Sequence, residues 1–115
     1  MTNLIDWPAL LKLTNNRLEL AKELLNMFAA ELPLLRSAIN TAHDKNDWKE
    51  MKSQVHKLHG SCCYTGVPDL KNLAHQLEEA LQLNHPEMVE TILKQLNSEI
   101  GRVLHTIQHK AYIDE

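Results

Sequence analysis

Apolar residues recur every three or four positions in the first half of the chain. The series consists of Leu18, Ala21, Leu25, Phe28, Leu32, Leu35, Ile39 and Ala42. Because an α-helix has about 3.6 residues per turn, this spacing places all of these side chains on one face. The series predicts a long helix over residues 16–43. Since the series continues on both sides of Pro33, we expect this proline to kink the helix and not to end it.

Shorter apolar series complete the pattern. Asp6 and Pro8 predict a short helix over residues 6–13, because an acidic N-cap and an early proline both suit a first turn. Three further series predict helices over residues 46–63, 68–83 and 86–110. Their predicted core positions are Trp48, Met51, Val55, Leu58 and Cys62, then Leu70, Leu73, Leu77 and Leu81, then Val89, Ile92, Leu96, Ile100, Val103 and Ile107. Loops of about 3 to 6 residues favour antiparallel neighbours.

The predicted fold is therefore all-α, an antiparallel four-helix bundle with a short additional N-terminal helix. Composition supports it, because aromatic residues make up only 4% and there are three glycines, whereas sheets and their hairpins favour aromatic residues and glycine. The 115 residues leave room for one domain at about 100 to 200 residues per domain. We expect a single domain over residues 1–115.

Charge and hydropathy exclude several classes of function. The net charge of −3 provides no general basic field, so we expect no nucleic-acid partner. No apolar run approaches the about 20 residues of a membrane span, and no signal peptide opens the chain. We therefore expect a cytoplasmic location without direct membrane contact. Cys62 and Cys63 are adjacent, which disfavours an ordinary disulfide.

The segment around His56 carries the candidate chemistry. Val55 and Leu58 belong to the core face, and a step of one residue turns a side chain by about 100°, so His56 is expected to be exposed. Lys52 and His59 lie one turn away on the same face, which makes this part of an acidic chain locally basic. An exposed neutral imidazole can attack a phosphoryl group, and nearby cations offset the charge of that group.

Gly60 permits two interpretations. Glycine within a helix is about 1 kcal/mol less favourable than alanine, and a helical Gly60, one turn beyond His56, would leave space beside the imidazole. Alternatively, Gly60 is the C-terminal cap and residues 61–65 form a loop. Cys62 continues the apolar series in phase past Gly60, which favours the first interpretation.

The segment HKLHGS at residues 56–61, with the later Gly66 and Glu78, resembles the signature of histidine phosphotransfer (HPt) domains. The likeness covers nearly the whole chain, including the pair Leu32-Pro33 within the long helix. The longer run HKLHGSCCYTGVP is similar to the C-terminal HPt domain of hybrid sensor kinases of the BarA and GacS type. The fold that this resemblance implies is the same helical bundle.

The resemblance implies that His56 accepts a phosphoryl group from the aspartate of a hybrid-kinase receiver domain and passes it to a downstream response regulator. The residues that it implies as support for the phosphoryl site are Lys52, Lys57, His59, Gly60 and Glu78. Gly60 matches a glycine that lets the receiver approach. His59 stands where many HPt domains have lysine, and Glu78 stands where several have a glutamine bonded to the active imidazole.

The same resemblance implies a monomeric phosphocarrier without autonomous catalytic activity. No cofactor is expected in the domain, and the partner receiver would supply Mg²⁺. The chain would belong to a hybrid sensor histidine kinase of the inner membrane, as its cytoplasmic C-terminal domain.

Two other functions stay open from the residues themselves, a metal-binding bundle and an interaction module that transfers nothing. The pairs His56/His59 and His105/His109 have chelating spacing, but no glutamate stands three residues before any histidine, so we expect no metal site. The other histidines that we considered, His43, His75 and His85, are expected to be solvated or to cap helices.

Overall fold

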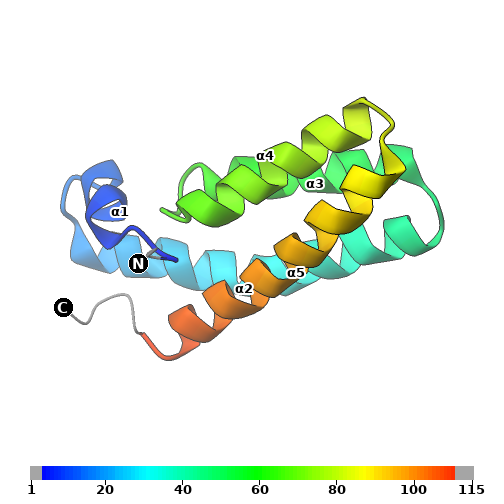
Figure 1. Cartoon of the computed structure of the whole chain (residues 1–115). Coiled ribbons are helices and arrows are strands. Elements are labelled where there is room, and N and C mark those ends of the chain that lie inside the picture. Colours follow the sequence, from blue (N-terminus) through cyan, green and yellow to red (C-terminus); the bar gives the residue numbers. More distant parts are fainter. Residues whose placement is uncertain (1–3, 111–115) are drawn as a thin grey trace.

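The computed structural model describes residues 4–110, and these residues form five α-helices and no strand (Figure 1). In chain order they are α1 (Trp7–Leu13), α2 (Leu18–Asp44), α3 (Trp48–Cys62), α4 (Pro68–Gln82) and α5 (Pro86–Gln108). None of these helices combines the length and the hydropathy that crossing a membrane requires. The predicted all-α fold is confirmed.

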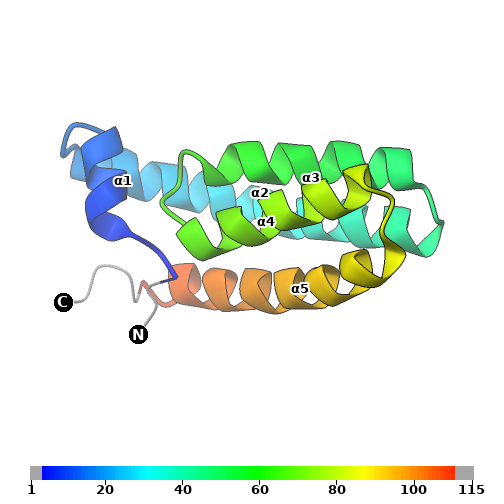
Figure 2. The ribbon, with the colours of Figure 1, turned by 45° about the horizontal axis from the view of Figure 1, so that its top comes forward.

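Helices α2 to α5 form the bundle. Each packs against the next, and α5 closes the ring by packing against α2. In Figure 2, α4 lies between α3 and α5, with α2 behind them, and successive helices run in opposite directions. The short helix α1 packs across the N-terminal end of α2 (Figure 1). The antiparallel four-helix bundle with one short additional helix is therefore confirmed.

Asparagines in the left-handed backbone region mark the turns between the helices. The φ angles are 53° at Asn15, 59° at Asn16, 56° at Asn46 and 54° at Asn84. Asparagine tolerates this region better than most residues, and a right-handed helix does not continue through it. Consequently α2 and α3 begin at positions 18 and 48, later than the predicted starts at 16 and 46.

Gly66, in the loop between α3 and α4, contacts the residue that precedes α1. Its φ is 64°, and a Cβ at this position would lie 2.8 Å from the carbonyl oxygen of Asp6. The Gly66 carbonyl accepts a hydrogen bond of 2.6 Å from the backbone N–H of Asp6. The Asp6 side chain in turn accepts one of 3.1 Å from the backbone N–H of Ala9 and caps α1. Both the conformation and the close approach require glycine here.

The core lies where the apolar series places it. All the predicted positions of α2 are buried except Leu18, in the first turn, which is 45% exposed. Helix α2 runs on through the exposed Pro33. In α4, Leu73 is only half-buried because it borders a groove between α4 and α5, and Ala74 and Ala80 complete the core of that helix.

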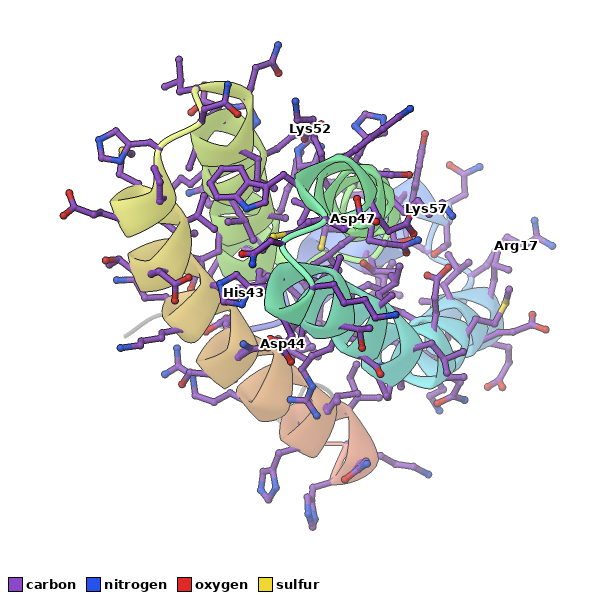
Figure 3. The ribbon with its side chains drawn as sticks, turned by 90° about the vertical axis from the view of Figure 1, so that its right-hand side faces the viewer. Arg17, His43, Asp44, Asp47, Lys52 and Lys57 are labelled. Atoms are coloured by element: carbon purple, nitrogen blue, oxygen red, sulfur yellow. The ribbon has the colours of Figure 1, made fainter. Side chains whose placement is uncertain are left out.

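Polar side chains also join α2 to α5. The amide groups of Asn40 and Asn97 exchange hydrogen bonds of 2.9 and 3.1 Å. The imidazole of His43 pairs with Glu90 of α5 and lies 3.7 Å from Asp44. Figure 3 shows His43 at the end of α2, directed toward α5. The expectation that His43 is solvated or caps a helix is wrong, because the acid across the helix interface holds it.

One carboxylate lies inside the bundle. Glu99 of α5 is 2% exposed; its Oε1 pairs with Arg102, and its Oε2 is buried without a hydrogen-bond partner among residues 4–110. Glu99 lies three residues after Leu96 and four before Val103, both of them core residues. A carboxylate therefore lies buried beside the apolar series of α5, next to Ile100.

Candidate functional site

Helix α3 presents His56 to solvent. The Asp47 side chain caps the helix by accepting a hydrogen bond of 3.1 Å from the backbone N–H of Glu50. Val55 and Leu58 are fully buried, and this fixes the rotation of the helix about its axis. The His56 side chain is consequently 74% exposed. The predicted exposure of His56 is confirmed.

Glu78 of α4 holds one nitrogen of the His56 ring. The distance between Nδ1 of His56 and Oε2 of Glu78 is 2.6 Å. An ionised carboxylate can only accept a hydrogen bond, so the hydrogen lies on Nδ1. In the neutral ring Nε2 then carries the free lone pair, and it is the nitrogen available as a nucleophile.

The surface cavity at His56 has a volume of about 410 Å³ and is rich in lysine. Its lining residues are Lys49, Lys52, Ser53, His56, Lys57 and Glu78. In Figure 3, Lys52 and Lys57 leave α3 on the side of the bundle away from α5. Lys49 completes the group; its position seven residues before His56, two helical turns back, places it on the same face of α3.

His59 lies on the Glu78 side of the site. It is not among the residues that line the cavity at His56. Its side chain is 25% exposed, its Nδ1 lies 4.0 Å from Oε1 of Glu78, and its ring centroid is 5.5 Å from that of His75 on α4. His59 therefore contacts the second oxygen of the carboxylate that holds His56.

Gly60 lies inside α3, whose C-cap is Cys63. The interpretation of Gly60 as the C-terminal cap is therefore wrong. A Cβ added to Gly60 would meet no atom within 4 Å. Nothing within the described chain requires a glycine at this position, and the surface beside His56 is open there.

A second, more apolar groove lies between α2 and the end of α3. It has a volume of about 560 Å³ and is lined by Leu24, Met27, Phe28, Ala30, Glu31, Leu34, Ser61, Tyr64 and Thr65. Three of these side chains are large and well exposed, Met27 at 62%, Leu34 at 72% and Tyr64 at 67%. We refer to these lining residues as the α2–α3 groove. Ser61 donates a hydrogen bond of 2.9 Å to Glu31 across it.

The two cysteines contribute no nucleophile to the site. Cys62 is a buried core residue, and burial raises the pKa of its thiol from 9.0 to about 12, with a smaller contribution from neighbouring Cys63. The thiol form therefore dominates at neutral pH. Cys63 donates a weak hydrogen bond of 3.4 Å from Sγ to the carbonyl of His59.

The remaining predicted histidines take part in local contacts. His85 caps α5 by accepting a hydrogen bond of 3.4 Å from the backbone N–H of Met88, as expected. The rings of His105 and His109 lie 4.1 Å apart, between centroids. Within residues 4–110, no group of three or more His, Cys, Asp or Glu side chains is arranged to hold a metal ion. Nothing in this region favours the metal-binding alternative.

Comparisons with known proteins find related sequences. A family model described as an Hpt domain matches residues 23–106. The chain is 31% identical over 94 residues to the signal transduction histidine-protein kinase BarA of Escherichia coli, and 34% identical over 99 residues to the sensor histidine kinase GacS of Pseudomonas protegens. These matches cover 76% and 86% of the chain, but only 10% and 11% of the relatives. The chain thus spans about a tenth of the length of these relatives.

A solved structure gives a closer match in length. The crystal structure of an HPT domain from a hybrid sensor histidine kinase of Shewanella is 34% identical to this chain. The match covers 92% of both chains, with a TM-score of 0.84.

Proposed function

The chain belongs to the Hpt domain family, and from this premise we propose that His56 carries the phosphoryl group in a phosphorelay. The observation that supports this assignment best is the state of the His56 ring. It is 74% exposed, and Glu78 occupies its Nδ1. The cavity that His56 lines also contains three lysines. This combination suits a nucleophile for phosphorus.

In the proposed reaction, Nε2 of His56 attacks the phosphorus of an aspartyl phosphate in line with the bond that breaks. The N–P bond forms as the P–O bond breaks, and the receiver's aspartate leaves as a carboxylate. The hydrogen on Nδ1 stays on the ring, so positive charge develops there during the attack. The Glu78 carboxylate stabilises that charge and holds the ring in one orientation. The return reaction on a second receiver retraces these steps.

The lysines supply charge compensation in this proposal. A phosphoryl group carries about −1.5 to −2 charges at pH 7. Lys52 and Lys57 lie beside His56, within one helical turn, and Lys49 is one turn further away. Long flexible ammonium side chains can follow the phosphoryl group without a fixed geometry. We therefore assign the compensating charge to these lysines and not to His59.

The partners that we propose are a receiver domain as donor and a response regulator as acceptor. Gly60 leaves the surface beside His56 open, and the α2–α3 groove offers exposed Met27 and Leu34 as apolar contact area. In this proposal the receiver supplies Mg²⁺, because lysines and one carboxylate already bonded to His56 make a poor site for a divalent cation. We further propose that the chain is the cytoplasmic HPt domain of a hybrid sensor histidine kinase and acts as a monomer.

The decisive experiment is phosphoryl transfer from a radiolabelled receiver of a hybrid kinase. We expect the wild type to gain label that is labile in acid and stable in base. His56→Gln should fold normally by circular dichroism and gain none. The matched control is His105→Gln, which removes an exposed histidine of α5 and should label fully. Label on His56→Gln, or receiver binding by the wild type without any label, would refute the proposal.

A further inference from the structure

Four titratable side chains form a continuous line of contacts behind His56. Glu78 faces His56 with Oε2, at 2.6 Å, and His59 with Oε1, at 4.0 Å. The ring of His59 lies 5.5 Å from that of His75, between centroids. His75 in turn pairs with Glu79 at 3.5 Å. Counted from His56, the order of the groups is therefore imidazole, carboxylate, imidazole, imidazole and carboxylate.

Phosphorylation of His56 would place a second negative charge near the carboxylate of Glu78. The phosphoryl group adds about −1.5 to −2 charges close to a carboxylate that is 23% exposed. Like charges at this separation repel, and partial burial weakens the screening by water. The lysines of the cavity lie on the side of the phosphoryl group, whereas His59 contacts the other oxygen of the carboxylate. A proton on His59 would offset the charge of Glu78 directly.

We propose that Glu78 couples phosphorylation of His56 to protonation of His59, so that the domain takes up a proton as it accepts the phosphoryl group. The inference rests on the proposed function of His56. The covalent step stays as described above; the additional proton comes from solvent to the free nitrogen of the His59 ring. It returns to solvent when the phosphoryl group leaves. His59 is a positioning residue that acts through Glu78 and does not touch the transferred group.

The surroundings of His59 are consistent with such a change of charge. On α3, His56 faces the same carboxylate, and Cys63, the C-cap of α3, donates a weak hydrogen bond to the backbone carbonyl of His59. On α4, the ring of His75 lies beside His59, and Glu79 pairs with His75. On α2, Glu31 is the acid whose side chain reaches this end of α3, through Ser61. Histidine ordinarily titrates near pH 6.5, so a modest electric field changes its charge at neutral pH.

The coupling predicts that the yield of phosphorylated domain falls as the pH rises. Because the coupled reaction takes up a proton together with the phosphoryl group, phosphorylation becomes less favourable as the pH rises. The pair is partly exposed, and such pairs contribute about 0.2–1 kcal/mol. The yield of phosphorylated domain should therefore fall by about 1.4- to fivefold between pH 6 and 8, relative to a protein with a fixed charge.

The test compares three proteins with one phosphorylated receiver, so that the pH response of the receiver cancels. His59→Lys carries a fixed charge and serves as the reference at each pH. The wild type should match it at pH 6 and fall below it at pH 8. His59→Gln should be reduced by a constant factor at every pH. If wild type and His59→Gln show the same pH profile relative to His59→Lys, the coupling is refuted.

A second measurement does not depend on the folding of variants. Ring nitrogen shifts of ¹⁵N-histidine report the protonation of each imidazole in the wild type. At pH 7, phosphorylation of His56 should increase the protonated fraction of His59 and leave that of His105 unchanged. An unchanged His59 overturns the coupling. A wild type that gains no label at any pH refutes instead the assignment of His56, which keeps the two failures apart.

Discussion

The three glycines of this chain predict three different results for the same substitution. In α3, Gly60 has no atom within 4 Å of an added Cβ. In α5, Gly101 would place a Cβ 3.9 Å from Nη1 of Arg36, an ordinary contact. Gly66 alone among them has a positive φ, of 64°, and a Cβ there would lie 2.8 Å from Asp6 O. Alanine substitutions at the three positions therefore report three different effects: helix propensity at Gly101, steric strain at Gly66, and helix propensity together with access to His56 at Gly60.

For Gly60→Ala we expect a more stable protein that transfers the phosphoryl group more slowly. Alanine is favoured over glycine in a helix by about 1 kcal/mol, and Gly60 is two residues from the end of α3, where fraying reduces the gain. We expect about 0.5–1 kcal/mol, which raises the melting temperature by about 2–5 °C. The added methyl group faces the approaching receiver, and a displacement of about 1 Å from the reactive geometry can slow transfer by about 10- to 100-fold.

Gly101→Ala is the matched control, because it makes the same change within a helix at a distance from His56. It should raise the melting temperature similarly and leave the transfer rate unchanged. Gly66→Ala should lower stability by about 1–3 kcal/mol, since alanine is strained at this φ and collides with a backbone oxygen. The assays are thermal unfolding by circular dichroism and single-turnover transfer from a labelled receiver. A Gly60→Ala protein that transfers as fast as Gly101→Ala would refute the docking role of this surface.

Two further predictions concern buried ionisable groups. Glu99→Met should raise the free energy of unfolding, measured in urea, by about 1 kcal/mol, because it removes a buried carboxylate whose Oε2 has no partner among residues 4–110. Arg102→Ala should lower it by about 1–3 kcal/mol, because it leaves that carboxylate without its ion pair. Equal stability of the two variants would contradict this reasoning. The raised pKa of Cys62, about 12 instead of 9.0, means that above pH 9 the unfolded chain loses this proton first, so stability should fall as pH rises from 9 toward 12. Cys62→Ala should show a shallower decline over that range, and parallel profiles would refute the assignment.

Local sequence patterns predicted the helices and the exposed His56 because both depend on neighbours within one helix. The apolar series fixes which face of α3 is buried, and the position of His56 follows from it. The starts of α2 and α3 were misplaced because the left-handed conformations of Asn16 and Asn46 depend on the turns, which the apolar spacing does not describe. Resemblance to a family placed Glu78 beside His56, a contact that spacing within one helix does not reveal.

The errors concern contacts between helices that are distant in sequence. His43 was expected in solvent because its partner, Glu90, lies on α5, and periodicity along α2 gives no register between the two helices. The resemblance implied that His59 supports the phosphoryl site, and its position one turn from His56 does not reveal which residues of α4 its ring meets. In the bundle it leans toward α4 and reaches Glu78. Glu99 lies beside the apolar series of α5, where a carboxylate is seldom buried, and only the packed bundle shows that it is buried.

The site combines one precisely placed group with several loosely placed ones, and the fold explains the difference. The His56 ring is oriented from a second helix, and the buried Leu58 and Leu77, which neighbour this pair in sequence, fix how α3 and α4 face each other. In-line attack needs this precision, because the rate depends steeply on the angle and distance of Nε2. Charge compensation falls off slowly with distance, so lysines on flexible side chains suffice for it. For the proposed exchange with two receivers, this division has an advantage, since the nucleophile stays fixed while the charges adapt to each partner.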